Sequence, residues 1–307
     1  MNASVVVCTF NRCDLLAKVL DSLECMVIDP AVEWEVLIVD NNSTDSTAAI
    51  GKSFVRKHSK RFRYLLEKQQ GKSFALNAGI RTARGEILAF TDDDLTVDQN
   101  WLAQLLNTFE RFNCAGVGGK IVPVWECSRP DWFQSDSTHQ LMSAIVSFDL
   151  GETPRQVKTA FFGANMAFKK EVFQKHGGFR IDLGPTVGSE IRGEDTEFCR
   201  RLLTAGEDLI YTPDAVVYHP VEKRRIEKSY FQDWYLGRGR ASILEGGIPQ
   251  DVIRYFGVPR YMLALLCKRI SKWVFSFNPK LRFYNKLDVY ELIGQILESR
   301  RTSLSGK

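Results

Sequence analysis

The chain has 307 residues, of which 44% are hydrophobic, 25% charged and 11% aromatic. This composition is typical of a folded globular protein and excludes a chain that is disordered throughout. The length allows one large α/β domain or two smaller ones, and the net charge of +4 is too small to indicate binding of nucleic acid by itself.

Neither a secretory signal nor a membrane-spanning segment is visible in the sequence. The first residues lack a basic stretch followed by a long apolar one, and no apolar run reaches the length of about 18 residues that a spanning helix needs. The seven cysteines include no CxxC pair, which fits thiols that stay reduced. We therefore expect a cytoplasmic protein that does not span a membrane.

Apolar runs and helical patterns alternate over the first hundred residues. Residues 4–10 form a continuous apolar run, which is typical of a strand buried on both faces. Residues 15–23 then repeat leucine and valine at the three-and-four spacing of a helix. The same reasoning predicts strands at 36–39, 62–66 and 86–91, and helices at 73–83 and 101–106. This alternation predicts an α/β fold with a mostly parallel sheet and helices on both faces.

The strand and helix rhythm becomes less regular beyond Gly116, so mixed strands and long loops are expected there. Residues 215–220 form the last strand-like run, and the chain that follows is largely helical and basic. We therefore predict an α/β domain over residues 1–225 and a helical, basic extension over residues 226–307.

Polar side chains follow three of the predicted strands, at residues 9–12, 40–42 and 92–94. Ligands of an open parallel sheet bind beyond the carboxyl ends of its strands, so these side chains are expected to surround one small polar ligand. The glycine-rich loops that bind dinucleotides or the phosphates of nucleoside triphosphates are absent, since neither GxGxxG nor GxxxxGK[ST] occurs.

Three adjacent carboxylates, Asp92, Asp93 and Asp94, end an apolar strand. Like charges that are buried side by side repel each other, and a divalent cation with oxygen ligands relieves that repulsion. The alternative is a solvated acidic turn that caps the next helix, a role that Asp98 already fills. The residues alone leave both interpretations open.

Five segments occur in the order and spacing of a known family. They are residues 8–12 (CTFNR), 39–45 (VDNNSTD), 71–73 (GKS) with 76–79 (LNAG), 90–94 (FTDDD), and 193–198 (GEDTEF) with Arg201. Together they resemble the family 2 glycosyltransferases over about residues 3–220. The resemblance implies the nucleotide-sugar-binding glycosyltransferase A fold, which is Rossmann-like, and an inverting transfer.

The resemblance implies roles for the first two polar strand ends. Thr9 and Asp40 match residues that hold the nucleobase, and Asn11 and Arg12 line the same pocket. The expected donor is a nucleoside diphosphate sugar, most simply a UDP-sugar.

Further donor contacts are implied by the later segments. Lys72 and Asn77 match the loop and helix beside the base, ribose and phosphates, and Asp92 matches the carboxylate that faces the ribose. Asp94 matches the ligand of a divalent cation, Mn²⁺ or Mg²⁺, that bridges to the diphosphate. Asp93 lies between them and is assigned to donor binding.

The helix predicted after Gly193 begins with acidic residues. Acidic residues in a first turn often only balance the helix dipole. Within the resemblance, Asp195 matches the catalytic base that deprotonates an acceptor hydroxyl, and Glu194 helps to place the acceptor. A carboxylate held beside an alcohol is what this proton transfer requires.

Three further residues are candidates with structural alternatives. His219 ends a strand pattern and matches a further metal ligand in some related enzymes, although a lone histidine is more often structural. Asn165 lies in a segment that resembles the family's acceptor side, and the alternative is a buried strand. Trp125 is expected to stack on a sugar ring, unless it packs in the core.

The C-terminal region carries the positive charge. No acidic residue lies between Asp251 and Asp288, whereas eight basic residues do, and without them the net charge of +4 becomes −4. The helix expected from Arg260 to Ser276 has an uneven apolar stripe. Either it docks on the catalytic domain and covers it, or residues 253–287 contact an anionic membrane as an interfacial helix.

These expectations combine into a metal-dependent inverting glycosyltransferase that acts on a saccharide or a lipid-linked glycan in the assembly of cell-surface polysaccharide or glycolipid. Its location would be cytoplasmic, or peripheral at the inner face of the cell membrane, with no nucleic-acid partner. The alternatives are a sugar-phosphate nucleotidyltransferase, whose glycine-rich loop is missing, and a non-catalytic membrane-associated scaffold that binds nucleotide sugars.

Overall fold

The computed structural model describes residues 1–133, 141–189, 191–249 and 251–305. The chain divides into two compact units. The first contains Met1–Trp125, Val146–Ile181 and Glu194–Val221, and the second contains Glu126–Ile145, Asp182–Gly193 and Glu222–Lys307. The final change of unit falls between Val221 and Glu222, and the domain boundary at 225/226 stays a prediction.

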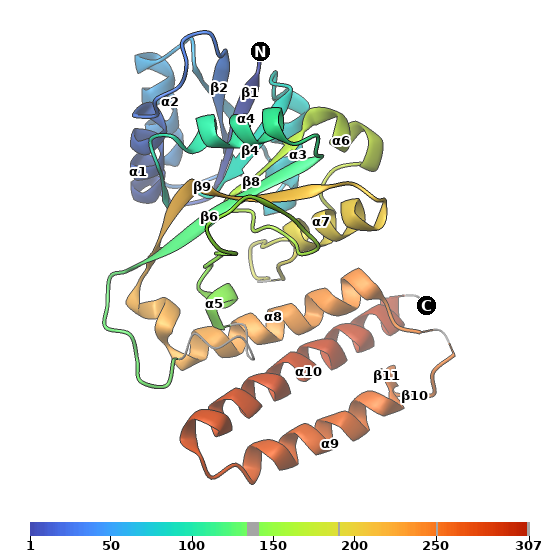
Figure 1. The fold of residues 1–307 in the computed structure, drawn as a ribbon. Helices are drawn as coiled ribbons and strands as arrows, with labels where there is room; N and C mark the ends of the chain where they lie inside the picture. The colour runs from blue at the N-terminus through green and yellow to red at the C-terminus, as the bar shows by residue number, and fades with distance from the viewer. Residues whose placement is uncertain (134–140, 190, 250, 306–307) are drawn as a thin grey trace. The chain divides into compact units, whose positions relative to one another are not determined.

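The first unit is built on a mixed, mostly parallel sheet (Figure 1). Its described strands follow the order β3-β2-β1-β4-β8-β6-β9-β5, and β7 pairs with β9. Strands β1 to β4 pair in parallel with one another, whereas β8 is antiparallel to both β4 and β6. This arrangement confirms the expected α/β class. The strands are β1 (Ala3–Thr9), β2 (Trp34–Asp40), β3 (Phe62–Leu66), β4 (Ile87–Thr91), β5 (Thr96–Val97), β6 (Gly116–Trp125), β7 (Arg155–Val157), β8 (Met166–Lys169) and β9 (Leu209–Val221).

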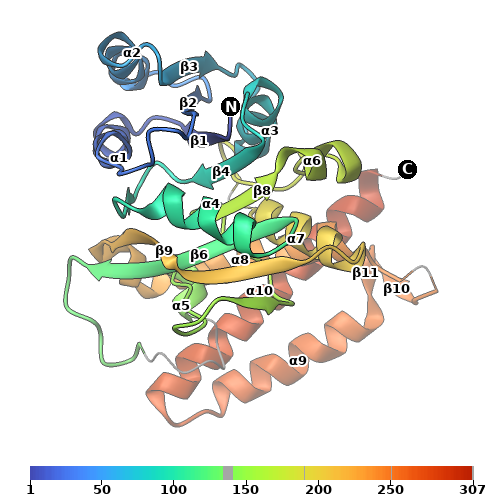
Figure 2. The same cartoon turned by 45° about the horizontal axis from the view of Figure 1, so that its top comes forward.

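Helices cover both faces of this sheet. In Figures 1 and 2, α1 and α2 lie on one face and α3 lies on the other. Each helix packs through an apolar stripe; α1, for example, buries Leu16, Val19, Leu20 and Leu23. The helices of this unit are α1 (Cys13–Glu24), α2 (Thr47–Lys57), α3 (Lys72–Thr82), α4 (Trp101–Arg111), α6 (Lys170–His176) and α7 (Glu194–Thr204).

The register of the parallel strands aligns their carboxyl ends. Thr9, the last residue of β1, is paired with Asp40, the last residue of β2. On the other side of β1, Val7 is paired with Thr91, the last residue of β4. The polar residues that follow these strands therefore share one edge of the sheet, as expected from the sequence.

A glycine brings helix α3 close to the sheet. A Cβ atom on Gly79 would lie 2.5 Å from Cγ1 of Val6 in β1. Only glycine allows this approach without a shift of the helix, and the approach fixes α3, whose first residue is Lys72, against the sheet.

An aromatic cluster anchors helix α7. The ring of Phe198 stacks on Phe173 with centroids 4.8 Å apart, and it meets Phe168 of β8 edge-on at 5.0 Å. Aromatic pairs of this geometry add to the stability gained by burial. The first turn of α7, with Glu194 and Asp195, is therefore held in a fixed position relative to the sheet.

The second unit is mainly helical. Its described elements are α5 (Leu141–Ala144), a short 3₁₀ helix η2 (Lys223–Ile226), α8 (Lys228–Gly246), β10 (Arg254–Tyr255), β11 (Val258–Pro259), α9 (Arg260–Val274) and α10 (Pro279–Ser305). Apolar residues from α8, β11, α9 and α10 form one buried cluster, namely Ile243, Val258, Met262 and Leu292. Among the described residues, no helix combines the length and apolar character needed to cross a bilayer.

A segment distant in sequence joins these helices. Trp132 packs edge-on against Phe231 of α8, with centroids 5.3 Å apart, and against Phe283 of α10, at 4.9 Å. The hydroxyl of Tyr284 donates a hydrogen bond to the backbone oxygen of Trp132 over 2.6 Å. Trp132 is thus part of the packing of the second unit.

Candidate active site

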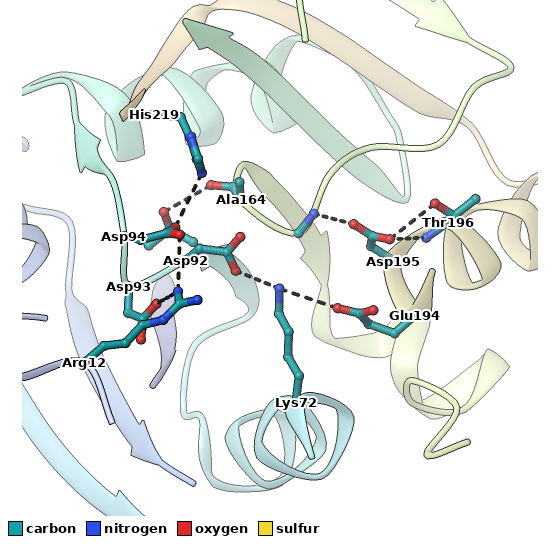
Figure 3. A network of polar contacts seen from close by, with 12 residues as sticks. Arg12, Lys72, Asp92, Asp93, Asp94, Ala164, Glu194, Asp195, Thr196 and His219 are labelled. Atoms are coloured by element: carbon teal, nitrogen blue, oxygen red, sulfur yellow. Dashed lines mark hydrogen bonds and ion pairs between the residues drawn. The ribbon is translucent and has the colours of Figure 1, made fainter. Parts of the chain in front are cut away.

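The candidate active site lies at the carboxyl ends of β1, β2 and β4. Asp93 and Asp94 are buried, although both belong to the turn that follows β4. Figure 3 shows that they are part of one network of polar contacts, which also contains Arg12, Lys72, Glu194 and Asp195. Two carboxylates of the acidic triplet, those of Asp93 and Asp94, are therefore buried, whereas that of Asp92 is partly exposed.

Arg12 neutralises two of these carboxylates. Its Nη1 atom lies 2.8 Å from Oδ1 of Asp93 and 3.2 Å from Oδ2 of Asp94. Burial raises the pKa of the Asp93 carboxyl above its ordinary value, and Arg12 opposes that shift. The side chain of Arg12 is itself partly exposed, so it can be reached by a ligand that enters the site.

Asp94 also faces a buried histidine. Nε2 of His219 lies 3.5 Å from Oδ1 of Asp94, and the other ring nitrogen, Nδ1, has no hydrogen-bond partner among the described residues. A carboxylate oxygen and an imidazole nitrogen are both ligands that Mn²⁺ accepts. Asp94 and His219 thus bring one carboxylate and one imidazole close to each other.

The protein does not supply a complete ligand set by itself. Within residues 1–133, 141–189, 191–249 and 251–305, no group of three or more His, Cys, Asp or Glu side chains is placed to hold a metal ion. Mg²⁺ and Mn²⁺ normally complete their coordination with waters and substrate phosphates. The residues present therefore fit a cation that is bound together with a diphosphate.

The carboxylate of Asp40, the last residue of β2, is held by two hydrogen bonds. The hydroxyl of Tyr64 donates to Oδ2 of Asp40 over 2.6 Å, and the backbone N–H of Ser43 donates to Oδ1 over 2.8 Å. Burial and the neighbouring carboxylate raise the pKa of Tyr64, so this phenol stays protonated and keeps donating. Both carboxylate oxygens are therefore oriented before any ligand binds.

Asn11 connects the first two polar strand ends. Its backbone is in the left-handed region, with φ of 51°, where asparagine is tolerated better than most residues. Its Oδ1 atom accepts the N–H of Thr44 over 2.7 Å, and its own N–H donates to Oγ of Ser43 over 2.9 Å. The loops after β1 and β2 are thereby fixed to each other, beside the buried Thr9.

Lys72 joins the acidic triplet to helix α7. Its Nζ atom lies 2.8 Å from Oδ1 of Asp92 and 3.4 Å from Oε1 of Glu194. Burial by itself would lower the pKa of Lys72, but the two carboxylates raise it above the ordinary value. Burial also raises the pKa of Glu194, against the effect of Lys72. One ammonium group thus bridges segments more than a hundred residues apart in the sequence.

The short loop before β8, which contains Gly163 and Ala164, forms hydrogen bonds to Asp195 and to the end of β4. The backbone N–H of Gly163 donates to Oδ2 of Asp195 over 2.7 Å, while the backbone oxygen of Ala164 accepts the hydroxyl of Thr91 over 3.1 Å. The N–H of Thr196 donates to the other Asp195 oxygen, also over 2.7 Å. Asp195 and the residue before the acidic triplet are therefore tied to adjacent residues of one loop (Figure 3).

The comparison with known families decides the identity. The model described as Glycosyl transferase family 2 matches residues 4–177, which is more than half of the chain. The chain is a family 2 glycosyltransferase. The expected resemblance is therefore confirmed, and the enzyme class is that of a glycosyltransferase.

Relatives and solved structures agree with this family. The chain is 26% identical over 250 residues to a glucosyl-dolichyl phosphate glucuronosyltransferase of Haloferax volcanii, covering 78% of this chain and 74% of the relative. It is 27% identical over 226 residues to the succinoglycan biosynthesis protein ExoM of Rhizobium meliloti, covering 73% and 69%. A mannosyltransferase of Pyrobaculum calidifontis, solved with GDP-Man and Mn²⁺, has a TM-score of 0.58 at 22% identity, covering 99% of this chain and 74% of that one. That likeness supports the glycosyltransferase A fold.

The side chains of Asn77 and Asn165 form hydrogen bonds to other residues of the protein. The amide of Asn77 donates to the backbone oxygen of Phe179 over 2.8 Å and accepts its N–H over 2.9 Å. Asn165 is buried; its Nδ2 donates to the backbone oxygens of Lys120 and Ala215, each over 2.9 Å. Oδ1 of Asn165 accepts the indole N–H of Trp101 over 2.8 Å. Their predicted substrate contacts stay predictions.

Trp125 lies in β6, two residues beyond Pro123, which is paired with His219 of β9. It is the last residue of β6, is half-buried, and is paired in register with Val221 of β9. Its predicted stacking on an acceptor sugar also stays a prediction.

Sequence reasoning missed Tyr64 and included Asn41 only in the polar run at 40–42, with no role of its own. Tyr64 lies in a strand, and only the pairing of β2 with β3 brings its hydroxyl to Asp40. Asn41 is buried behind the site, where its Oδ1 accepts the N–H of Gly71 over 2.8 Å and its Nδ2 donates to the oxygen of Gln69 over 2.6 Å. Asn41 thus shapes the loop before Lys72. Its place beside Asp40 was the only signal for it in the sequence.

Proposed function

We propose that this enzyme is a metal-dependent inverting glycosyltransferase that moves a sugar from a nucleoside diphosphate donor, most simply a UDP-sugar, to a hydroxyl of a saccharide or lipid-linked glycan. The observation that carries the proposal is the bridge from Asp92 through Lys72 to Glu194, beside Asp195. It joins the predicted donor side and the predicted acceptor side in one polar network.

In this proposal the donor binds at the strand ends. Thr9 and Asp40 hold the nucleobase, for which the fixed Asp40 carboxylate is a ready hydrogen-bond acceptor. Asp92 faces the ribose, and the cations of Arg12 and Lys72 face the diphosphate. Asn11 and Asn77 contribute by fixing the loop after β2 and helix α3, and Asp93 contributes by holding Arg12.

The proposed metal ligands are Asp94 and His219. A divalent cation bound there would supply positive charge to the leaving diphosphate. The protein's part is to present one carboxylate oxygen and one imidazole nitrogen from two neighbouring segments of the sheet.

Asp195 is the proposed base. The N–H groups of Gly163 and Thr196 donate hydrogen bonds that fix the orientation of its carboxylate. A fixed orientation matters because a base must be within hydrogen-bond reach of the hydroxyl whose proton it takes. Glu194 is proposed to help place the acceptor. Asn165 would contribute on the acceptor side by fixing the loop whose Gly163 binds Asp195. Trp125 would stack on a sugar ring of the acceptor that is farther from the base.

The proposed acceptor class follows from the relatives. The Haloferax relative is named for a dolichyl-phosphate-linked sugar, and the Rhizobium relative for biosynthesis of succinoglycan. A lipid-linked acceptor would bring the reaction to a bilayer, so we place the enzyme in the cytoplasm or peripherally at the inner face of the membrane, with contact through residues 253–287.

The test is nucleotide release from a panel of UDP-sugars and GDP-sugars, with and without Mn²⁺. Release is expected from one donor class and only with Mn²⁺. Release that is equal without Mn²⁺ in the presence of a chelator would refute the metal part of the proposal.

The assignment of the base is tested by Asp195→Asn. This change keeps the shape of the side chain but removes the proton acceptor, so turnover should fall by about a hundredfold or more. Binding of UDP, measured by calorimetry, should be nearly unchanged. Asp214→Asn, at an exposed position of β9, is the matched control and should retain normal turnover. Normal turnover of Asp195→Asn would show that another group is the base.

A further inference from the structure

A tight turn comes directly before β8 in the site. The N–H of Asn165 donates to the backbone oxygen of Phe162 over 3.0 Å, which closes a turn with Gly163 and Ala164 at its centre. The end of the turn is fixed to the sheet, because the side chain of Asn165 forms hydrogen bonds to groups of α4, β6 and β9. The centre of the turn depends on other contacts.

Thr91 contacts the centre of this turn from the end of β4. The backbone pairing of β4 with β8 ends at Phe90 and Met166. One residue further along β4, the hydroxyl of Thr91 donates to the backbone oxygen of Ala164 over 3.1 Å, and both residues are buried. A side-chain hydrogen bond thus continues the connection between the two strands beyond their backbone pairing, directly before Asp92.

Burial by itself does not explain this hydrogen bond. Buried hydroxyls generally find a partner, yet Thr212 of β9, which is also buried, has none among the residues that the structure describes. The oxygen that Thr91 binds belongs to the residue after Gly163, whose N–H lies 2.7 Å from Oδ2 of Asp195 (Figure 3). The dihedral angles of a closed turn depend on one another, so a shift at one central residue moves the other.

We propose that Thr91 is a positioning residue for the base Asp195. Its hydroxyl holds the oxygen of Ala164, the turn passes this position on to the N–H of Gly163, and that N–H sets the direction of the Asp195 carboxylate. Because residues 92–94 directly follow Thr91, the base is held at a fixed place relative to the donor carboxylates. Displacing a reacting group by about 1 Å can cost about a hundredfold in rate. The proposal rests on the proposed function for the role of Asp195.

The first test is Thr91→Val, which keeps a β-branched side chain in the strand but removes the donor. The kcat of sugar transfer should fall about tenfold, while the KM for the donor should change less than about twofold. Thr91→Ser, which restores the hydroxyl, should recover most of the rate. Thr212→Val makes the same exchange where the hydroxyl has no described partner, and should keep normal turnover. A normal kcat of Thr91→Val, or equal losses in both valine variants, would overturn the proposal.

A double variant shows whether Thr91 acts through the base. Asp195→Asn has no proton acceptor left to position, so adding Thr91→Val to it should lower kcat further by less than about twofold. A role of Thr91 in general stability or in donor binding would instead reduce the rate in both backgrounds. Losses that multiply would therefore overturn the proposal.

The last test needs no turnover. Hydrogen exchange at residues 161–165 of the full chain without ligands, followed by mass spectrometry, should be about tenfold faster in Thr91→Val than in the wild type. Exchange in Thr91→Ser and Thr212→Val should match the wild type. Unchanged exchange in Thr91→Val, with an active wild-type chain, would refute this inference alone. A wild-type chain that transfers sugar from no nucleoside diphosphate donor would refute the proposed function.

Discussion

Arg12 and Lys72 allow several carboxylates to remain buried at one edge of the sheet. Arg12 lies against Asp93 and Asp94, and Lys72 lies against Asp92 and Glu194. Without these cations the clustered acids would repel one another and lose solvation together. Because Arg12 contacts Asp94, the proposed metal ligand, the guanidinium would compete with a divalent cation for the same carboxylate.

Arg12→Gln should therefore strengthen binding of Mn²⁺ in the absence of nucleotide, by about tenfold, since it removes a positive charge within 3.2 Å of Asp94. If Arg12 moves to the diphosphate when the donor binds, the same variant should weaken UDP binding in the presence of Mn²⁺. Calorimetric titration of Mn²⁺ with and without UDP measures both effects. Lys18→Gln, an exposed lysine of α1, is the control, and an unchanged affinity of Arg12→Gln for Mn²⁺ would contradict the competition.

At the scale of elements, helices α8 and α10 approach each other through two glycines. A Cβ on Gly239 of α8 would collide with the backbone oxygen of Glu291, and a Cβ on Gly294 of α10 would collide with the backbone oxygen of Leu236. The contacts are reciprocal, so each helix presents a glycine to the backbone of the other. Close helix packing of this kind is lost when any side chain is added.

Gly239→Ala should destabilise the second unit by about 1–3 kcal/mol despite the better helix propensity of alanine. The matched control is Gly246→Ala at the end of the same helix, where a Cβ would meet no atom within 4 Å. The control should be neutral or slightly stabilising. Urea unfolding followed by tryptophan fluorescence measures both variants, and equal midpoints would show that the close approach of α8 and α10 does not limit stability.

At the scale of the whole molecule, the second unit is assembled from three separate parts of the chain. Residues 126–145 contribute Trp132, which packs on Phe231 and Phe283. Residues 182–193 contribute Leu183 and Ile191, which cluster with Ala241 of α8. Ending the chain at residue 225 would therefore remove α8 and α10, against which residues 126–145 and 182–193 pack.

A shortened chain of residues 1–225 should consequently be less soluble and melt at a lower temperature than the full chain, because Trp132, Leu183 and Ile191 lose their apolar partners. Size-exclusion chromatography and thermal unfolding measure these effects. Trp132→Ser in the shortened chain should restore part of the solubility. A soluble shortened chain with an unchanged melting temperature would instead support an independent domain that ends at residue 225.

The sequence predicted the strands and their polar ends well because both are local patterns. The runs at 4–10 and 86–91 became β1 and β4, and the register then placed residues 9 and 40 together. Long-range pairing was not predictable in this way. The match of β6 with β9 and the contact of Tyr64 with Asp40 depend on partners far apart in the chain. The same holds for Asn165, whose pattern fits a strand although its side chain serves three distant groups.

The hydrogen bond from Gly163 to Asp195 is donated by a main-chain N–H, which determines which mutations can remove it. No replacement of the side chain deletes that donor, except proline, which lacks an N–H. A screen that scans this loop with alanine would leave the donor in place and overlook it. The donor itself thus survives most single-codon changes, and what a larger residue at position 163 would disturb is the space beside it, since a Cβ there would lie 3.3 Å from Nζ of Lys72 and 3.5 Å from Oδ2 of Asp195.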